Sequence, residues 1–570
     1  MTTSDLNYVR VIDPRLDINS SRNKTYGILS GAPYQTGRIL PSTSFSNSQI
    51  TWNAPPPSHD IYTNRRFLAR VKFRIDFTGT SAGAGIPLLQ AFGMNTAPGV
   101  SAGNFNYDAP RAMPLSQALQ TVQVTIGNQT FSSNLNVYSR IFQRYHRNEF
   151  QEDGDFSYSP SMPDQSQAYS ELNGFPRNPL GGYGDNVTQC PRGGFTDCII
   201  TSNTSTGTPA DTASIELTVT EAIPLSPLSF DANQEQLSFI GVDMMTIQLQ
   251  LGGRGSGLLT GLAQSLWSHS TLGSALTSAT ATVEQADLLF NYLTPSSLQY
   301  LPDLVTYNYN EFTNYPTRAS APLAPGASTV LAMSSVTLPT IPNRLYIFAS
   351  PQDSDTNITD TDTFCRISNI NLTFANQDGI LSNYSPQMLY DMSLKNGLNY
   401  SWTQWQQKVG SVACAEFGTD IPLKDAWAPG VRTSQTLQML VTITNIHPTK
   451  TFTPTLNILS VQEGIVTIDR GSVSKNIGVL DEKQVLDSWD TTPIPQKRSV
   501  NIFGASLGGG AFWQDVGTFF KRLVRPGINV AKALAPSQFQ PVVSAVSDVA
   551  SSYGLGFRDV AKRRGAALLM

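Results

Sequence analysis

The stretch CRISNINLTFANQDGILSNYSPQMLYDMSLKNGLNYSWTQW, residues 365–405, contains the clearest changes of secondary structure in the chain. Ile370, Leu372 and Phe374 alternate with small or polar residues, which is the period of a β-strand with one buried face. The Asn-Gln-Asp-Gly segment that follows, residues 376–379, predicts a turn because its glycine is free to adopt a positive φ.

Two short helices are predicted after this turn. Ser385-Pro386 is typical of an N-cap and a first helical residue, and Gly397 predicts the end of that helix. Leu389 and Met392 fall on one face of it. Ser401 predicts a second cap, followed by a helical turn that carries Trp402 and Trp405. A strand, a helical excursion and a return to strands indicate a β-sandwich with elaborated loops.

Length and composition favour a large all-β protein. A chain of 570 residues is too long for one core, and all-β domains often contain roughly 200–250 residues. Only 14% of the residues are charged, against the roughly 25% of typical soluble domains. The remainder is rich in residues that suit strands, long loops and surfaces buried against other subunits. Two large β domains with terminal segments are therefore predicted.

The resemblance to a known family lies mainly in residues 379–405. GIL at 379–381, LYD at 389–391, a serine, NG at 396–397 and a tryptophan occur in the order and spacing of the major capsid proteins of virophages and polinton-like viruses. The segment Pro41–Ser46 also resembles a stretch near the N-terminus of that family. The resemblance implies a double jelly-roll, two eight-stranded sandwiches standing side by side. It further implies that three copies form a capsomer with a near-hexagonal outline, as in adenoviruses and many large DNA viruses.

Strand and loop patterns divide the chain under this interpretation. The predicted parts are an N-terminal arm (1–40), a first jelly-roll with long outer loops (41–293), a linker (294–307), a second jelly-roll (308–495) and a tail (496–570). Alternating apolar residues predict strands at 71–77, 122–126, 245–251, 283–293, 345–348, 367–374, 437–443 and 456–461, with a further strand at 465–468. Gly127-Asn128 predicts a hairpin turn. The spacing of Leu135, Tyr138, Phe142 and Tyr145 predicts a helix, and residues 151–210 predict a long loop region.

The tail differs in charge from the rest of the chain. From Lys497 onward it has ten Lys/Arg and three Asp/Glu, a net charge of +7, leaving 28 basic and 39 acidic residues elsewhere, a net charge of −11. A basic tail is suited to nucleic acid or anionic lipid, whereas the acidic body is not. On a helix, one apolar face would contain Phe512, Trp513, Val516, Phe519, Phe520 and Leu523. This pattern predicts a membrane-active amphipathic helix.

A protease site is predicted immediately before that helix. Leu507, Gly508, Gly509, Gly510 and Ala511 fit the Leu-x-Gly-Gly pattern that adenovirus-type maturation proteases cut, so cleavage after Gly510 is the hypothesis. The released segment would begin Ala511-Phe512-Trp513, which is similar to the start of the membrane-lytic protein of adenoviruses. Three roles for the tail stay open: membrane disruption, packing beneath the capsid floor, and contact with genomic DNA.

Catalytic, cofactor and metal sites are not indicated. Residues 504–508 match the G-x-S-x-G elbow of hydrolases, but that chain order needs a later histidine, and His59, His146, His269 and His447 all precede it. The glycine run 252–257 lacks the Lys-Ser/Thr of a phosphate loop and predicts a turn. No two histidines have metal-ligand spacing. His146 is interpreted as a helix-end or interface residue. The protein is predicted not to be an enzyme.

Four cysteines, Cys190, Cys198, Cys365 and Cys414, are too few for a disulfide framework and favour a reducing compartment, although a Cys190–Cys198 pair stays open. There is no signal-peptide pattern and no apolar run of about 18 residues. Assembly in the host cytoplasm or a viral factory is therefore expected, with the mature protein in the virion.

The leading hypothesis is a major capsid protein that forms homotrimers and an icosahedral shell around a double-stranded DNA genome. Its expected partners are sister subunits, neighbouring capsomers, penton and minor capsid proteins, and a maturation protease. The alternative is a carbohydrate-binding β-sandwich protein, which would form a small soluble oligomer rather than a shell.

Overall fold

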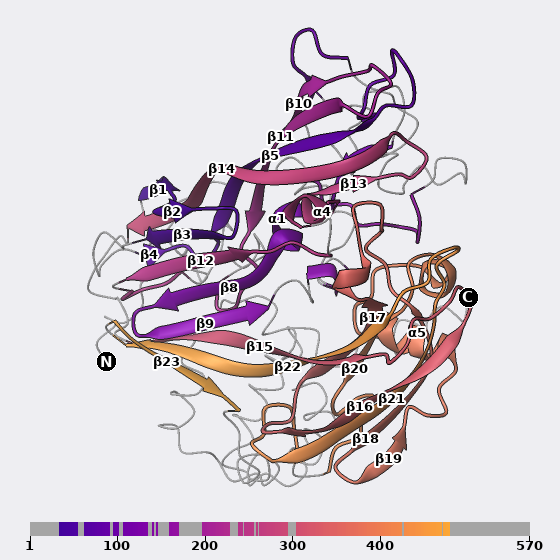
Figure 1. Cartoon of the computed structure of the whole chain (residues 1–570). Helices are drawn as coiled ribbons and strands as arrows, with labels where there is room; N and C mark the ends of the chain where they lie inside the picture. Colours follow the sequence, from indigo (N-terminus) through magenta and orange to yellow (C-terminus); the bar gives the residue numbers. More distant parts are fainter. Residues whose placement is uncertain are drawn as a thin grey trace, which may run out of the picture.

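The computed structural model describes residues 34–54, 62–91, 95–101, 107–134, 139–141, 144–145, 159–169, 197–228, 238–242, 244–255, 258–259, 261–294, 304–424, 427–469 and 471–478. Within them the chain is mainly β-structure, arranged as two pairs of facing sheets (Figure 1). The N-terminal part of the chain builds the first pair and the later part builds the second.

The first pair contains a large sheet and a smaller one. The large sheet has the order β1 (Tyr34–Pro41), β14 (Ala275–Thr294), β5 (Leu68–Thr80), β11 (Asp211–Ala222), β10 (Cys198–Asn203) and β6 (Asn95–Thr96), and β4 (Tyr62–Thr63) pairs with β14. The smaller sheet has the order β2 (Ser44–Phe45), β3 (Gln49–Ala54), β12 (Met245–Leu251), β8 (Leu119–Ile126) and β9 (Gln129–Asn134). In the loops lie α1 (Pro114–Ala118), α4 (Leu262–Leu266) and the short ribbon of β7 (Asp108–Pro110) with β13 (Trp267–His269).

The second pair is simpler. One sheet has the order β15 (Leu304–Arg318), β22 (Pro454–Asp469), β17 (Arg344–Pro351) and β20 (Val412–Glu416), with β23 (Ser472–Ile477) paired to β22. The other has the order β16 (Ser328–Leu338), β21 (Gln435–Thr444), β18 (Arg366–Phe374) and β19 (Gln377–Ile380). Its loops carry α5 (Pro386–Lys395), the 3₁₀ turn η3 (Asp353–Asp355) and the π-turn η4 (Gln404–Lys408).

Both pairs have the same topology. Each pair has eight principal strands, which are β1, β3, β5, β8, β9, β11, β12 and β14 in the first and β15 to β22 in the second. When they are numbered 1 to 8 along the chain, one sheet reads 1-8-3-6 and its partner reads 2-7-4-5 in both cases, with antiparallel neighbours. This double Greek-key order is that of a jelly-roll. The predicted double jelly-roll is confirmed, and the shared strand order supports a duplicated architecture that the sequence alone does not reveal.

The alternating residues occupy the buried faces as predicted. In β5, Val71, Phe73, Ile75 and Phe77 are buried while the residues between them are partly or fully exposed. Val122, Val124 and Ile126 do the same in β8. Gly127 follows with φ 56°, and a Cβ on it would lie 2.7 Å from the carbonyl oxygen of Gly471. Glycine is therefore required at this predicted turn, both for its conformation and for the close approach of the second jelly-roll.

The two predicted helices after β19 are confirmed in detail. The hydroxyl of Ser385 accepts the N–H of Met388, and Pro386 is the first helical residue of α5. At the other end the N–H of Leu398 donates to Ser393 O and that of Gly397 donates to Leu394 O, which is a Schellman motif. Ser401 and Gln404 cap the following turn reciprocally.

The turn before β19 differs from the prediction. It lies at Ala375 and Asn376, whose φ values of 52° and 66° form a two-residue hairpin, and Gln377 already pairs with Phe374. Asp378 and Gly379 instead belong to β19, in which Gly379 has the predicted positive φ, at 80°. The hydrogen-bonded register of β18 and β19 determines the turn here, and it overrides the turn preference of Asp-Gly.

Three further segments differ from the predicted boundaries. Residues 34–40, placed in the arm, belong to β1, because β1 pairs with β14 from Tyr34↔Thr294 to Pro41↔Asp287. Residues 304–307, placed in the linker, are the beginning of β15. Residues 465–468 are not a separate strand but continue β22, since β15 pairs along its whole length. Residues 139–141 and 144–145 are helical, which agrees with the predicted helix where the structure describes it.

Candidate assembly site: the junction between the two jelly-rolls

The two jelly-rolls lie side by side and point the same way (Figure 1). Because successive strands alternate in direction, the connections 1–2, 3–4, 5–6 and 7–8 lie at one end of each jelly-roll, here called the loop end, and the others lie at the base end. At the loop end, the 7–8 connection of the first jelly-roll meets the 3–4 connection of the second, where the N–H of His269 donates to Ile358 O. At the base end, the Gly127-Asn128 turn between β8 and β9 contacts the second jelly-roll, where the Asn128 side chain accepts the N–H of Val473. Like ends are therefore in contact.

Aromatic contacts close the base end. Tyr307, at the start of β15, lies edge-on to Phe239 of the first jelly-roll at 5.2 Å and donates its hydroxyl to Ser238 O. The guanidinium of Arg65 lies 5.3 Å above the Tyr307 ring and donates to Pro227 O. Burial lowers the pKa of Arg65 to about 10, so this cation remains charged at neutral pH and favours the ring contact.

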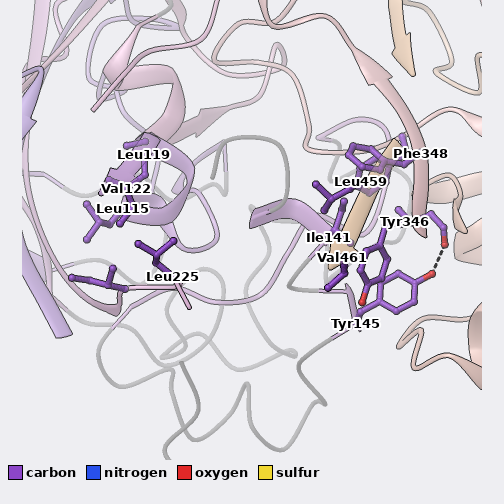
Figure 2. Close-up of a cluster of buried hydrophobic side chains, with 14 of the residues drawn as sticks. Leu115, Leu119, Val122, Ile141, Tyr145, Leu225, Tyr346, Phe348, Leu459 and Val461 are labelled. Atoms are coloured by element: carbon purple, nitrogen blue, oxygen red, sulfur yellow. Dashed lines mark hydrogen bonds between the residues drawn. The ribbon is translucent and has the colours of Figure 1, made fainter. Parts of the chain in front are cut away.

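A helical segment of the first jelly-roll enters the core of the second. Ile141 and Tyr145 lie among Tyr346, Phe348, Leu459 and Val461 (Figure 2). The Tyr145 ring lies edge-on to Tyr346 at 5.0 Å, and its hydroxyl donates to Val412 O at 2.5 Å. These apolar side chains belong to one cluster of buried residues that runs through both jelly-rolls. The two halves therefore share an apolar core.

The segment 159–169 lies in the long connection between strands 5 and 6 of the first jelly-roll and makes polar contacts with the second jelly-roll. The Gln167 amide donates to Phe364 O and Val409 O, and its carbonyl accepts the hydroxyl of Thr363. At its other end, the Ser159 hydroxyl donates to the buried carboxylate of Glu221, which also accepts two N–H groups at the start of α1. The segment thus fastens the second jelly-roll to the scaffold of the first.

Asp362 is the charged centre of the junction. Its carboxylate accepts hydrogen bonds from Arg111 at 3.2 Å, Gln117 at 2.8 Å and Arg254 at 2.9 Å, all from the first jelly-roll. Burial alone would raise the pKa of Asp362, but the nearby arginines hold it well below its usual range. Arg111, which is fully buried, also donates to four backbone carbonyls on both sides of the junction. Removing the Asp362 carboxylate would leave the buried arginines without the charged partner that they share, which makes this cluster a specific joint.

A buried imidazole lies close by. Nδ1 of His269 is 2.8 Å from the Asp108 carboxylate, and Nε2 is 2.8 Å from Ser274 O. Both nitrogens face acceptors, so both donate when the ring is protonated. Burial would lower the pKa of His269, but Asp108 and the Ser274 carbonyl outweigh it and raise this pKa above 6.5. The pair holds the β7–β13 ribbon together, which indicates a structural role rather than a catalytic one.

The predicted tail sites cannot be placed. Residues 507–523, with the proposed protease site and apolar face, lie outside the described residues, as do the G-x-S-x-G segment, His59, His146 and Cys190. Cys365 and Cys414 are buried free thiols, and Cys198 is buried in β10. Gly252 and Gly253 pack so closely that a Cβ on either would lie about 2 Å from Gln120 or Gly261, in keeping with a tight turn. The described part of the chain contains no group of three potential metal ligands. None of its helices is long and apolar enough to cross a membrane.

Two jelly-rolls sharing one core and pointing the same way define a double jelly-roll protein, and comparison with known proteins identifies its family. Residues 4–293 match the model of the Sputnik virophage major capsid protein first domain, and residues 312–409 match that of the major capsid protein V20 C-terminal domain. The chain is 31% identical over 535 residues to capsid protein V20 of the Sputnik virophage, covering 88% of this chain and 85% of the relative.

Solved structures agree. A chain in the cryo-EM structure of the Sputnik virophage superposes with a TM-score of 0.72 at 30% identity, covering 87% of this chain and 98% of that one. The mavirus major capsid protein gives a TM-score of 0.65 at 15% identity over 86% and 99% of the two chains, which supports the fold. The chain belongs to the virophage major capsid protein family, and its location is the virion capsid.

Proposed function

We propose that three copies of this chain associate into a pseudo-hexagonal capsomer and that these capsomers tile an icosahedral shell around double-stranded DNA. The observation that carries the proposal is the parallel, side-by-side placement of two jelly-rolls with the same strand order. Three chains around a threefold axis would present six similar barrels, which is a near-hexagonal tile. Repeating one interface by symmetry would also cover exposed sheet edges. Neighbouring capsomers, penton proteins and minor capsid proteins would be the partners of such a tile.

Electron microscopy of the purified protein tests this directly. Class averages are expected to show three-lobed particles with a hexagonal outline. A small ring or dimer without threefold symmetry would favour the carbohydrate-binding alternative and contradict the capsomer.

The shared core supports a purely structural role. Tyr145 and Asp362 make hydrogen bonds between the two jelly-rolls, and the buried carboxylate of Glu221 accepts hydrogen bonds from the start of α1. We therefore propose that the protein works by assembly and not by catalysis. Incubating it with general esterase and glycosidase substrates is expected to give no turnover, and turnover removed by substituting a single residue would contradict this.

The tail is proposed to be released and to act on membranes. The sequence Leu507–Ala511 supports cleavage after Gly510, and the apolar face beginning at Phe512 supports membrane binding. Mass spectrometry of mature particles is expected to find chains ending at residue 510, and intact 570-residue chains would contradict cleavage. A peptide of residues 511–527 is expected to leak liposomes, whereas its Trp513→Glu counterpart should not. Retention of the peptide beneath the shell or on DNA would be the opposite outcome.

A further inference from the structure

The junction inside one chain joins two different surfaces. The first jelly-roll contributes helical residues of its connection between strands 5 and 6, among them Ile141. The second contributes one face of its sheet 1-8-3-6, where Leu459 and Val461 lie beside Ile141 (Figure 2). Because both jelly-rolls have the same topology, the second also has a connection between strands 5 and 6, and the first also has a sheet 1-8-3-6. In the described part of the chain these two counterparts lie far apart (Figure 1).

A shared hydrogen bond aligns the two 1-8-3-6 sheets. The N–H that follows strand 6 donates to the carbonyl that precedes strand 3, from Phe417 to Asn343 in the second jelly-roll and from Ile223 to Phe67 in the first. Strand 3 therefore begins at equivalent positions, Arg344 and Leu68. Their partners on strand 8 are Val461 and Leu289. Leu289 is thus the counterpart of a residue that the junction covers.

The counterpart face of the first jelly-roll carries an uncovered apolar row. Ile39 of β1 lies directly opposite Leu289 of β14, which lies opposite Leu68 of β5, so all three share one face of the sheet. Ile39 is 63% exposed and the other two are partly exposed, whereas Val461 at the junction is only 7% exposed. The same place on the equivalent sheet is therefore apolar in both jelly-rolls but covered in only one.

The counterpart of the covering helical residues is α5. It follows strand 5 of the second jelly-roll after a short turn, as the helical residues beginning at 139 follow strand 5 of the first. Leu389 and Met392 of α5 are buried. Met388 and Leu394 are 48% and 49% exposed, so α5 also presents apolar side chains on its outer surface.

We propose that the outer surface of α5 in one copy docks on the Ile39–Leu289–Leu68 row of a second copy. This inference rests on the proposed trimer and names the two surfaces that build it. The contact is head-to-tail, because it joins the second jelly-roll of one chain to the first of the next. It repeats the internal junction between chains, so three copies close a ring of six jelly-rolls in which every such sheet face is covered.

Cross-linking of the full chain tests which surfaces meet. The double variant Ile39→Cys, Met388→Cys is made with Cys190→Ser, since the other native cysteines are buried. After treatment with a short bis-maleimide, a denaturing gel is expected to show linked dimers and trimers. Each single-cysteine variant should remain monomeric on the gel, because the contact joins unlike surfaces. Linked dimers from either single variant would overturn the head-to-tail contact, and so would the absence of linked species from the double variant.

Charged substitutions test the strength of the contact. Ile39→Glu and Met388→Glu should each raise the concentration at which trimers half-dissociate by about tenfold or more, measured by light scattering on dilution. The control Leu258→Glu alters a side chain that is 72% exposed in a loop of the first jelly-roll and should leave this concentration unchanged. Circular dichroism is expected to show that all three variants fold, because each replaced side chain is exposed.

The result separates the inference from the proposed function. If the wild type forms trimers but the two junction-like variants dissociate no more readily than the control, the surfaces named here are wrong and the trimer stands. If the wild type forms no trimer at all, both the proposed function and this inference fail.

Discussion

Replacing Asp362 by asparagine removes one charge from the junction and keeps the size of the side chain. Three buried arginines would lose their common carboxylate, and an amide oxygen accepts fewer and weaker hydrogen bonds from them. Removing one partner of a buried ion pair typically costs about 3–5 kcal/mol of unfolding free energy. With an unfolding entropy of roughly 2.1 cal/mol/K per residue over the chain of 570 residues, that cost lowers the melting temperature by about 2–4 °C.

Differential scanning calorimetry of the full chain provides the measurement, with Asp391→Asn on the exposed side of α5 as the matched control. The control is expected to melt within about 0.5 °C of wild type, as surface substitutions usually do. The pKa of Asp362 is depressed by folding, so its contribution is present above the ordinary carboxyl pKa of 3.8 and is lost as pH falls below it. The gap between wild type and Asp362→Asn should therefore be constant from pH 5 to 8. A melting temperature equal to that of the control would refute the junction as a joint.

Three other perturbations test separate parts of the account. Tyr145→Phe deletes only the hydroxyl, which donates to Val412 O, and should cost about 1–3 kcal/mol of unfolding free energy in denaturant titrations. Tyr145→Ala also removes the ring and should cost about 3–5 kcal/mol; equal effects would contradict the shared core. The pKa of His269 is raised by folding, so its stabilisation is complete below pH 6.5 and lost as pH rises through the raised value. The melting temperature should fall between pH 6.5 and 9 in wild type and less in His269→Gln, and parallel curves would argue against it. Val330 and Leu440 are exposed by 59% and 39% on the adjacent strands β16 and β21, so we expect them to lie near subunit contacts. The double variant Val330→Glu, Leu440→Glu should elute closer to the monomer in size-exclusion chromatography, with an unchanged melting temperature. Unaltered assembly would place the contact elsewhere.

Local patterns in the sequence were sufficient for α5 and for eight of the principal strands, but not for β11, β15 or β16, and β10 lies inside the region 151–210 that was predicted as a loop. Alternation in β5 and β8, the Ser385 cap and the Gly397 terminus depend on residues close together in the chain, so their chemistry is visible there. The turn at Ala375-Asn376 was not predicted, because pairing between β18 and β19 determines its position.

The junction could not be predicted for a different reason. Asp362 meets Arg111 and Arg254 across more than a hundred residues of sequence, and nothing near any of the three marks it as buried. A weak signal existed in Tyr145, the last residue of a helical apolar pattern beside two arginines. The tail could be interpreted from its composition alone, because its residues lie outside the described residues.

The molar mass of the purified full-length chain in solution tests the central claim most directly. Size-exclusion chromatography with light scattering is expected to give three times the chain mass of 61.9 kDa, about 186 kDa, or larger assemblies built from that unit. A stable, monodisperse species of 61.9 kDa across the concentrations at which capsids form would contradict the account.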